Sequence, residues 1–401
     1  FNDLNDLRPI STLSTFNKII EKFLYNRLMQ FILKYNLISN NQFGFRPKSS
    51  TQNAAIELVS FLRKSLDKKK IASVVFMDIK KAFDLVDRKI LMRMLNLIGI
   101  RGKVEEILES YLSQRFQAVK IGNKISKPLE VIYGVVQGSI LGSLLFNIFF
   151  NEITKLEGLS GKMILYADDV ALMNEHDPKE DITKVIQSDM KIILNFLDHQ
   201  RMIINSKKTN FMVFHSPFIK CTQPQSITLN DDHTITNITT MKYLGLHLDP
   251  QLKWDIHGSQ VAKKLASAAS IMWKLKNILP FVAKKQIYHS LFATHINYMV
   301  AIWRNACDTV IKPIQTIQNR MLRNMYGFER LDNQSLRSEA TKNSFGKKDI
   351  DHFGVNIINN LPIQIRKSVH IHAFKYRVRQ FISNDQFMSK CFNNSYLKSF
   401  G

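Results

Sequence analysis

The chain has few cysteines, and few acidic residues to balance its basic ones. Its 401 residues include three cysteines, Cys221, Cys307 and Cys391, and no pair has the spacing of a zinc site. An odd number of widely separated cysteines also argues against a disulfide framework and fits a reducing compartment. Lys and Arg number 56 against 33 Asp and Glu, giving a net charge of +23. Such a charge favours a polyanionic partner, although a basic soluble protein would also satisfy it.

Long uninterrupted apolar runs are missing as well. Residues 131–151 carry no charge, but glycine, serine, glutamine and asparagine interrupt them. We therefore expect a glycine-rich turn and a short buried helix there, with no membrane span. No repeat or low-complexity segment stands out. The sequence starts at Phe1 without a signal peptide or initiator Met, so we expect an intracellular piece of a longer product.

Acidic residues stand next to apolar runs at two places. Asp168 and Asp169 follow one run, and a second run, residues 72–77, ends at Asp78. Unpartnered carboxylates beside a buried strand are costly, and a divalent cation is one partner that would stabilise them. Two strands that bring Asp to one place can hold a pair of hard cations, the arrangement used for in-line phosphoryl transfer. We predict a nucleotidyl-transfer site.

The three carboxylates are not expected to be equal. Asp78 and Asp168 are the predicted metal ligands. Asp169 is ranked as a weaker ligand, because successive strand residues point to opposite faces unless the turn bends there. Caps of helices or turns are the alternative role for such acids.

Apolar periodicity predicts an α+β first half. We expect a helix capped by Ser14, a helix capped by Asp87 and stopped by Gly99, and Asp168 in a hairpin. Further helices are expected at 51–66 (with Ile56, Val59 and Leu62 inward), at the end of 134–151 and at 181–199, and strands at 72–78, 116–121, 129–133, 210–215 and 241–248.

After Asp249 the pattern becomes helical, and the positive charge is concentrated here. Residues 251–401 hold 23 Lys and Arg but 8 Asp and Glu. We expect a helical bundle whose last stripe exposes Lys312, Arg320 and Arg323 to nucleic acid, or equally to solvent. A short helical patch is expected near 372–382.

Seven segments stand in one order: Leu7–Ser11, Asn41–Pro47, Phe76–Asp84, Gly134–Ser139, Tyr166–Asp169, Asn205–Thr209 and Tyr243–Leu246. Each is weak alone, but in this order they resemble the reverse transcriptase of a non-LTR (LINE-type) retrotransposon, most similar to the jockey group. The resemblance implies a right-hand polymerase. Its parts would be fingers at 1–70, a palm with inserted fingers elements at 71–250, a helical thumb at 251–330 and a C-terminal basic extension at 331–401.

The resemblance also implies an activity, RNA-directed DNA polymerase, a nucleotidyltransferase. Two Mg²⁺ ions, with Mn²⁺ as a substitute, would lower the pKa of the primer 3′-hydroxyl and neutralise the leaving pyrophosphate. The partners would be an RNA template, a DNA primer or nicked target DNA, and dNTPs. An upstream endonuclease region of the same polyprotein is expected, as is action in the nucleus at the site of integration.

Several residues take roles from this resemblance. Phe83 would pack under the sugar and exclude a 2′-hydroxyl, unless it is an ordinary core aromatic. Gln137 and Gly138 would lie at the incoming base and template, unless they form a plain turn. Arg8, Lys18 and Arg46 would bind the triphosphate, and Arg46 is the best of these candidates. Lys208 would donate a proton to pyrophosphate. Tyr166 would support the primer end or pack beside the hairpin.

The chain departs from the family at two positions that often hold proline, Val136 and Ser143, which loosens a turn and removes no chemistry. Three other functions stay open. They are a catalytically inactive nucleic-acid-binding remnant of a mobile element, a group II intron-type reverse transcriptase, and an RNA-dependent RNA polymerase, which Phe83 disfavours.

Overall fold

A computed structural model of the chain describes residues 11–219, 223–230 and 233–326. The chain divides into two compact units, Phe1–Met321 and Leu322–Gly401. In chain order the helices are α1 Thr15–Lys34, α2 Thr51–Asp67, α3 Arg88–Leu97, α4 Lys103–Leu112, α5 Ile140–Phe150, α6 Ile182–His199, α7 Asp255–Leu275, α8 Phe281–Ile287, α9 Thr294–Asn297, α10 Val300–Trp303 and α11 Asp308–Tyr326, with a 3₁₀ turn at Asn151–Lys155 and a π-helical segment at Tyr288–Ala293.

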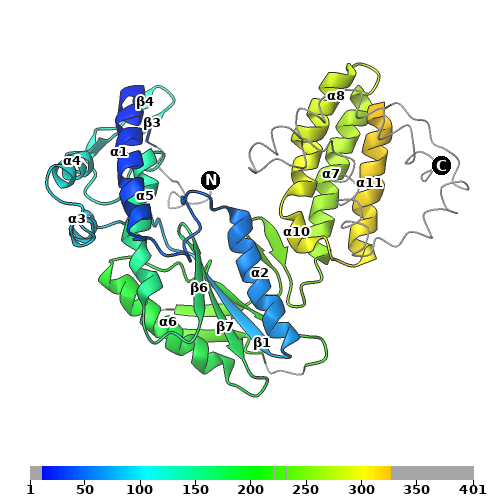
Figure 1. Cartoon of the computed structure of the whole chain (residues 1–401), viewed down its shortest axis with the longest axis horizontal. Coiled ribbons are helices and arrows are strands. Elements are labelled where there is room, and N and C mark those ends of the chain that lie inside the picture. The colour runs from blue at the N-terminus through cyan, green and yellow to red at the C-terminus, as the bar shows by residue number, and fades with distance from the viewer. Residues whose placement is uncertain (1–10, 220–222, 231–232, 327–401) are drawn as a thin grey trace, which may run out of the picture. The chain divides into compact units, whose positions relative to one another are not determined.

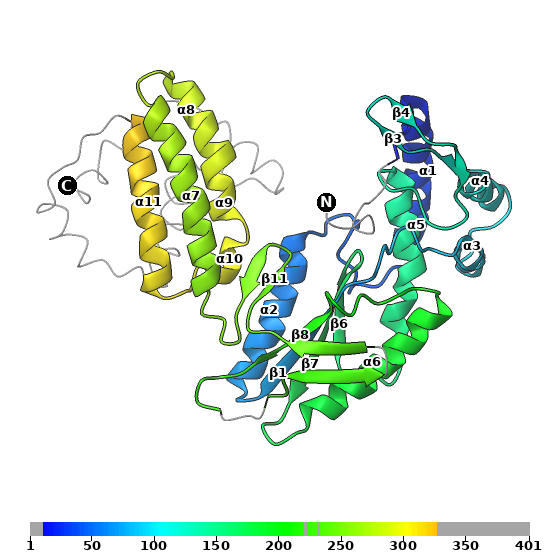
Figure 2. The same cartoon turned by 180° about the vertical axis from the view of Figure 1, so that it is seen from behind.

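The strands form one main sheet and three small pairs. They are β1 Ile71–Met77, β2 Phe116–Gln117, β3 Lys120–Ile121, β4 Lys124–Ile125, β5 Leu129–Glu130, β6 Lys162–Tyr166, β7 Asp169–His176, β8 Asn210–Phe214, β9 Ser226–Asn230, β10 His233–Asn237, β11 Met241–Tyr243 and β12 Leu246–Leu248. The main sheet has the order β6-β7-β1-β8-β10-β9, and its strands appear in Figures 1 and 2. β1 runs antiparallel to both β7 and β8.

Two hydrophobic cores cover the two faces of this sheet. Val75 and Met77 of β1 belong to the first core, to which α1, α3, α4, α5 and α6 contribute. Val74 and Phe76 belong to the second, which includes α2, β11, β12 and α7. All seven residues of β1 are buried, as expected for a strand covered on both faces. The mixed α+β class is confirmed.

The helix caps expected from the sequence are present. The Ser14 side chain accepts a hydrogen bond from Asn17 N at the start of α1. The Asp87 carboxylate accepts bonds from the first backbone amides of α3. Gly99 follows α3 with φ +97°, a left-handed conformation that glycine adopts without strain.

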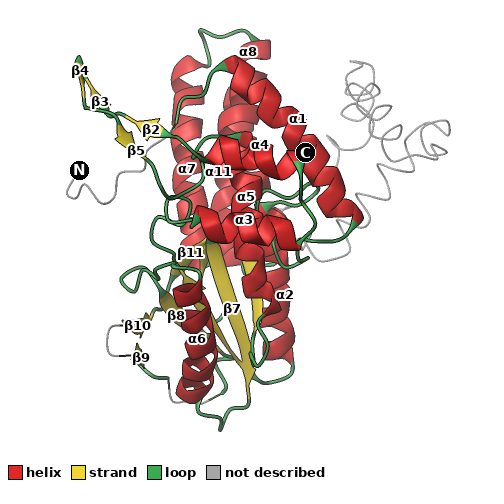
Figure 3. Ribbon diagram, turned by 90° about the vertical axis from the view of Figure 1, so that its left-hand side faces the viewer, coloured by secondary structure: helices red, strands yellow, loops and turns green. Residues whose placement is uncertain are grey.

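Other predictions need correction. Residues 241–248 form the hairpin β11–β12, because the chain turns at Gly245 with φ +90°. Residues 116–130 form two separate short pairs, β2–β5 and β3–β4, drawn as thin yellow arrows in Figure 3. Ile56 is exposed, as is an apolar group on the first half of α1, Phe16, Ile19, Ile20 and Phe23. Only the second half of α1 reaches the core, through residues such as Leu28 and Ile32.

Among the described residues, no helix is both long and apolar enough to cross a membrane. The helical patch expected at 372–382 and the extension at 331–401 lie outside the described residues.

Candidate active site

Asp78 directly follows the buried strand β1 and is held by the segment that precedes β8. Its backbone N–H donates to Thr209 Oγ1 at 3.2 Å, and its carbonyl oxygen accepts from Asn205 N at 2.8 Å. Its carboxylate Oδ2 accepts from Asn205 Nδ2 at 2.7 Å. Thr209 is fully buried, so the Asp78 backbone is fixed from inside the protein.

Asp168 and Asp169 lie at the tip of the β6–β7 hairpin. Tyr166 and Asp169 are the last paired residues, and Ala167 and Asp168 form the turn. Ala167 has φ +58°, the left-handed conformation that a tight two-residue hairpin needs. The chain thus turns through Ala167 and Asp168 immediately before Asp169, so the two acids are not successive residues of one straight strand. Asp168 is half-buried and Asp169 is exposed.

The strand register brings Asp78 to this hairpin. Met77 of β1 and Val170 of β7 are Cα partners in an antiparallel pair. Asp78, which follows Met77, and Asp169, which precedes Val170, therefore lie at the same end of the sheet. Antiparallel partners are about 4.5–5.5 Å apart at Cα. The predicted convergence of the two segments is therefore present at the level of the backbone.

The side chains do not complete a metal cluster. Within the described part of the chain, no three His, Cys, Asp or Glu side chains are arranged so that they could hold a metal ion. The donors have the chemistry that Mg²⁺ prefers, carboxylate oxygen. The Asp78 carboxylate, however, is bound to Asn205. The residues fit a divalent cation in type and in backbone position, and a carboxylate that accepts one hydrogen bond at Oδ2 keeps lone pairs that can ligate a cation.

The hairpin also faces the second core. Tyr243 of β11 is buried, and its ring centroid lies 5.5 Å from that of Phe76. Burial, followed by the negative charge of Asp169, raises the pKa of Tyr243. Tyr166 is half-buried and packs against the same core. Tyr166 therefore packs beside the hairpin, as one of its two expected roles requires, and its role at a primer end stays a prediction.

Phe83 lies in an aromatic stack beside the first core. Its ring is stacked on Phe146 with centroids 4.3 Å apart, and it meets the Phe45 ring edge-on at 6.1 Å. Phe83 is half-buried, so one part of the ring packs and another part is accessible. Both proposed roles, core aromatic and sugar contact, suit this placement.

The segment around Gln137 packs against Asp84, the residue that follows Phe83. Gln137 Nε2 donates to Asp84 Oδ1 at 2.9 Å, and Gly138 is exposed with φ +90°. At Gly134 an added Cβ would lie 2.8 Å from the Asp84 carbonyl oxygen, so only glycine permits this approach. Asp84 thus contacts Gln137, and Asp87 is the residue that caps α3.

The basic candidates that the structure describes, Lys18, Arg46 and Lys208, lie on different segments. The Arg46 guanidinium donates to Ser39 O and Asn40 Oδ1, both at 2.8 Å, and so holds its own loop. Lys18 on α1 and Lys208 before β8 are exposed. Arg8 lies outside the described residues. Triphosphate binding and proton donation by these residues stay predictions.

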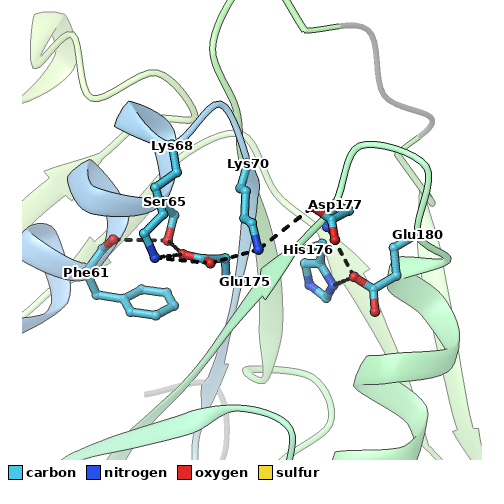
Figure 4. A network of polar contacts seen from close by, with 8 residues as sticks. All are labelled: Phe61, Ser65, Lys68, Lys70, Glu175, His176, Asp177 and Glu180. Atoms are coloured by element: carbon cyan, nitrogen blue, oxygen red, sulfur yellow. Dashed lines mark hydrogen bonds and ion pairs between the residues drawn. The ribbon is translucent and has the colours of Figure 1, made fainter.

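An ion-pair network secures the other end of β1 and β7, and Figure 4 shows it. Glu175 of β7 accepts a hydrogen bond from Ser65 Oγ at 2.8 Å and forms an ion pair with Lys70 at 3.2 Å. These contacts tie the end of α2 and the start of β1 to β7. A slip of one residue would move every β7 side chain, including Asp169, to the opposite face. The network therefore supports the register on which the site depends.

Sequence reasoning named no role for Gln42, Asn147, Asn205 or Thr209, although three of them stand in the recognised motifs. Gln42 and Asn147 are fully buried amides. Gln42 bonds Ala167 and Asn147 bonds Gly44, each across more than 100 residues of sequence, so no local pattern could have revealed these contacts.

Comparison with known proteins gives one family. The family model described as reverse transcriptase (RNA-dependent DNA polymerase) matches residues 2–248. The chain is 30% identical over 336 residues to a probable RNA-directed DNA polymerase from transposon X-element of Drosophila melanogaster. It is 26% identical over 342 residues to the RNA-directed DNA polymerase from mobile element jockey of Drosophila funebris. These matches cover 80% and 81% of this chain and 36% of each relative.

The chain therefore spans little more than a third of the length of these relatives. Among solved structures, telomerase from Candida tropicalis, in complex with a fragment of telomeric RNA, matches with a TM-score of 0.44 at 13% identity. That match covers 96% of this chain and 57% of the telomerase chain. Telomerase from Candida albicans matches with a TM-score of 0.42, also at 13% identity, over 77% of this chain and 56% of that chain.

Proposed function

Because this chain belongs to the reverse transcriptase (RNA-dependent DNA polymerase) family, we propose that it extends a DNA primer along an RNA template. One observation carries the proposal. The register Met77↔Val170 brings Asp78 and the Asp168–Asp169 hairpin to one end of the β1–β7 pair, inside the part of the chain that matches the family.

The family's right-hand arrangement maps onto the chain as follows in this proposal. Residues 1–70 are fingers, 71–250 are the palm with inserted fingers elements, 251–330 are the thumb and 331–401 are an extension. The position of the main sheet within 71–250 and the helical character of 255–326 support it.

Reverse transcriptases generally use divalent metal ions, and we propose Mg²⁺, in two ions, for this chain. Asp78 and Asp168 would hold the metal, with Asp169 as the weaker ligand. The metal would supply a lowered pKa for the primer 3′-hydroxyl and charge neutralisation for pyrophosphate.

The remaining residues act on the nucleotide. The accessible part of the Phe83 ring excludes a 2′-hydroxyl, which selects deoxynucleotides. Gln137 and Gly138 contact the base and template, and the Arg46 loop approaches the triphosphate. Nicked target DNA as primer, an upstream endonuclease and a nuclear site of action belong to the same proposal, because the family resemblance is to mobile elements. A tagged chain that stays out of the nucleus would contradict the last of these.

Primer extension on poly(A) with oligo(dT) tests the proposal. The wild-type chain should incorporate dTTP only with Mg²⁺ or Mn²⁺, and Asp78→Asn or Asp168→Asn should reduce incorporation by at least about a hundredfold. Asp67→Asn is the matched control, because Asp67 is an exposed acid at the end of α2 and should leave incorporation unchanged.

A second function is favoured by one observation, the excess of 23 Lys and Arg over 8 Asp and Glu in residues 251–401. That excess would suit an inactive remnant that binds nucleic acid through its positive charge. Salt-dependent RNA binding without any metal-dependent extension by the wild-type chain would establish the remnant and reject the polymerase. Incorporation of ribonucleotides at the deoxynucleotide rate would indicate an RNA polymerase instead. A preference for intron RNA over other templates would favour the group II intron type.

A further inference from the structure

The turn that carries Asp168 is held by a side chain from another part of the chain. Gln42 is fully buried. Its Oε1 accepts hydrogen bonds from Ala167 N at 3.1 Å and from Gly44 N at 2.8 Å. Its Nε2 donates to Ala167 O at 3.3 Å. One amide group therefore binds both backbone polar groups of the residue that precedes Asp168.

Ala167 needs these bonds for two reasons. It is 5% exposed, so water has little access to its N–H and C=O, and buried backbone groups without partners are costly. It also has φ +58°, a conformation that is unfavourable for a residue with a Cβ. The hydrogen bonds from Gln42 stabilise this conformation and compensate for its strain.

The backbone around Gln42 fits the hairpin closely. Phe43 N donates to Leu165 O at 2.8 Å, and Leu165 N donates to Asn41 O at 2.9 Å. The loop thus pairs with β6 on both sides of Gln42. At Gly44, an added Cβ would lie 2.2 Å from Ala167 N, so glycine alone permits this contact.

A second buried amide, that of Asn147, binds the backbone of this loop. Asn147 of α5 is fully buried, and its Nδ2 donates to Gly44 O at 2.8 Å. A continuous path of buried polar contacts therefore runs from α5 through Gly44 and Gln42 to Ala167. Asp168 follows at once.

We infer that Gln42 is a positioning residue that sets the orientation of the Asp168 carboxylate. The inference rests on the proposed function, since it gives Asp168 a catalytic role. Gln42 acts through Ala167 and touches no substrate. The role requires an amide, because Ala167 presents one donor and one acceptor and the Gln42 side chain answers both.

The first test replaces Gln42 by Met, which keeps the length and removes both polar atoms. We expect kcat for primer extension to fall about ten- to a hundredfold, because small misplacements of a reacting group have effects of that size. KM for dTTP and the affinity for primer–template should stay within about threefold, since neither contact is changed.

Asn151→Leu is the matched control. Asn151 is a buried amide in the 3₁₀ turn after α5, and it holds the start of the loop that carries Gln42: it accepts from Ser39 N at 2.8 Å and donates to Leu37 O at 3.0 Å. Its loss should lower the unfolding midpoint in urea as Gln42→Met does, and leave kcat per folded molecule unchanged. If both variants lose kcat equally, Gln42 has only a general structural role and the inference is wrong.

Gln42→Glu separates positioning from folding by its pH profile. Burial favours the neutral carboxylic acid, which has one O–H donor and one acceptor and can replace the amide. The ratio of kcat for Gln42→Glu to that of the wild type should therefore rise as the pH falls from about 8 to about 6. A ratio below one that does not change with pH would contradict the inference.

Hydrogen exchange distinguishes failure of this inference from failure of the proposed function. The Ala167 amide should exchange faster in Gln42→Met and at the wild-type rate in Asn151→Leu, whether or not the wild-type chain extends a primer. Unchanged protection of the Ala167 amide in Gln42→Met would show that Gln42 does not hold Ala167, and the inference would be wrong. Absence of extension by the wild-type chain, with protection lost as expected, rejects only the catalytic role of Asp168.

Discussion

Replacement of Gly44 by Ala tests whether the loop before α2 is packed on the hairpin as closely as the structure indicates. The new Cβ would lie 2.2 Å from Ala167 N and 3.0 Å from Ala167 Cα. Both are backbone atoms, so no flexible side chain can move aside. An ordinary contact needs about 3.4 Å or more, so loop and hairpin must separate by roughly 1 Å.

That separation determines the size of the effect. The pairing bonds Phe43 N–Leu165 O and Leu165 N–Asn41 O, now 2.8 and 2.9 Å, would lengthen to nearly 4 Å and cease to be hydrogen bonds. Their loss contributes about 1–3 kcal/mol, and overpacking adds about 1–3 kcal/mol. We expect Gly44→Ala to lower the free energy of unfolding by about 4 kcal/mol, a large part of the stability of a typical domain.

Urea unfolding measures the free energy of unfolding, and primer extension at matched folded fraction measures the activity. Gly122→Ala is the control, because Gly122 has φ +59° and no atom within 4 Å of an added Cβ; it should cost about 1 kcal/mol from backbone strain alone. Stability of Gly44→Ala within about 1 kcal/mol of wild type, with full extension activity, would refute the close packing and the reasoning built on it.

Three further predictions concern other parts of the chain. Asn205→Ala removes the 2.7 Å bond to the Asp78 carboxylate. We expect about 1.5–3 kcal/mol lower stability in urea and a changed Mg²⁺ concentration for half-maximal extension, and an unchanged Mg²⁺ dependence would show that Asn205 does not orient Asp78 for the metal. Phe83→Val should raise the ratio of ribonucleotide to deoxynucleotide incorporation by about tenfold or more in paired extension assays, whereas an unchanged ratio would leave Phe83 a core aromatic. Burial, with two neighbouring basic groups, lowers the pKa of His257 from 6.5 to about 4, so the unfolded chain binds a proton there that the folded chain does not. Stability should be complete above pH 6.5 and decline by about 3 kcal/mol towards pH 4; His257→Phe should flatten this part of the urea-derived profile, and an unaltered slope would exclude His257 as its source.

Much of the fold could be predicted wherever the signal is local. The caps at Ser14 and Asp87 need only a polar side chain and the amides two or three residues later. The helices α2 and α6 have one apolar stripe each, and their observed bounds match the expected ones within a residue or two.

Elements that depend on distant partners were missed. The strand expected at 210–215 is β8, but β9 and β10 were not expected, because their pairing depends on β8 and on each other. The helix α4 was missed although two of its leucines are buried. The exposed apolar residues at the start of α1 show the same limit, because periodicity indicates a helix but does not say how much of it is covered.

The candidate site divides in the same way. The position of the acids at one end of the sheet could be predicted, because each follows an apolar run that reads as a strand, and their role in metal binding stays a prediction. The groups that hold them could not. Gln42 and Ala167 are 125 residues apart, and Asn205 and Asp78 are 127 apart, so their contacts exist only after the sheet and loop have come together.

The position of β1 in the middle of the sheet has a consequence for synthesis of the protein. Ala72 has one Cα partner at Glu175 and the other at Phe214. A growing polypeptide must therefore extend beyond residue 214 before the apolar strand gains both neighbours. Until then Val74 and Val75 have no complete core to enter, and nascent chains should depend on chaperones and fold slowly, as sheets assembled from remote segments do.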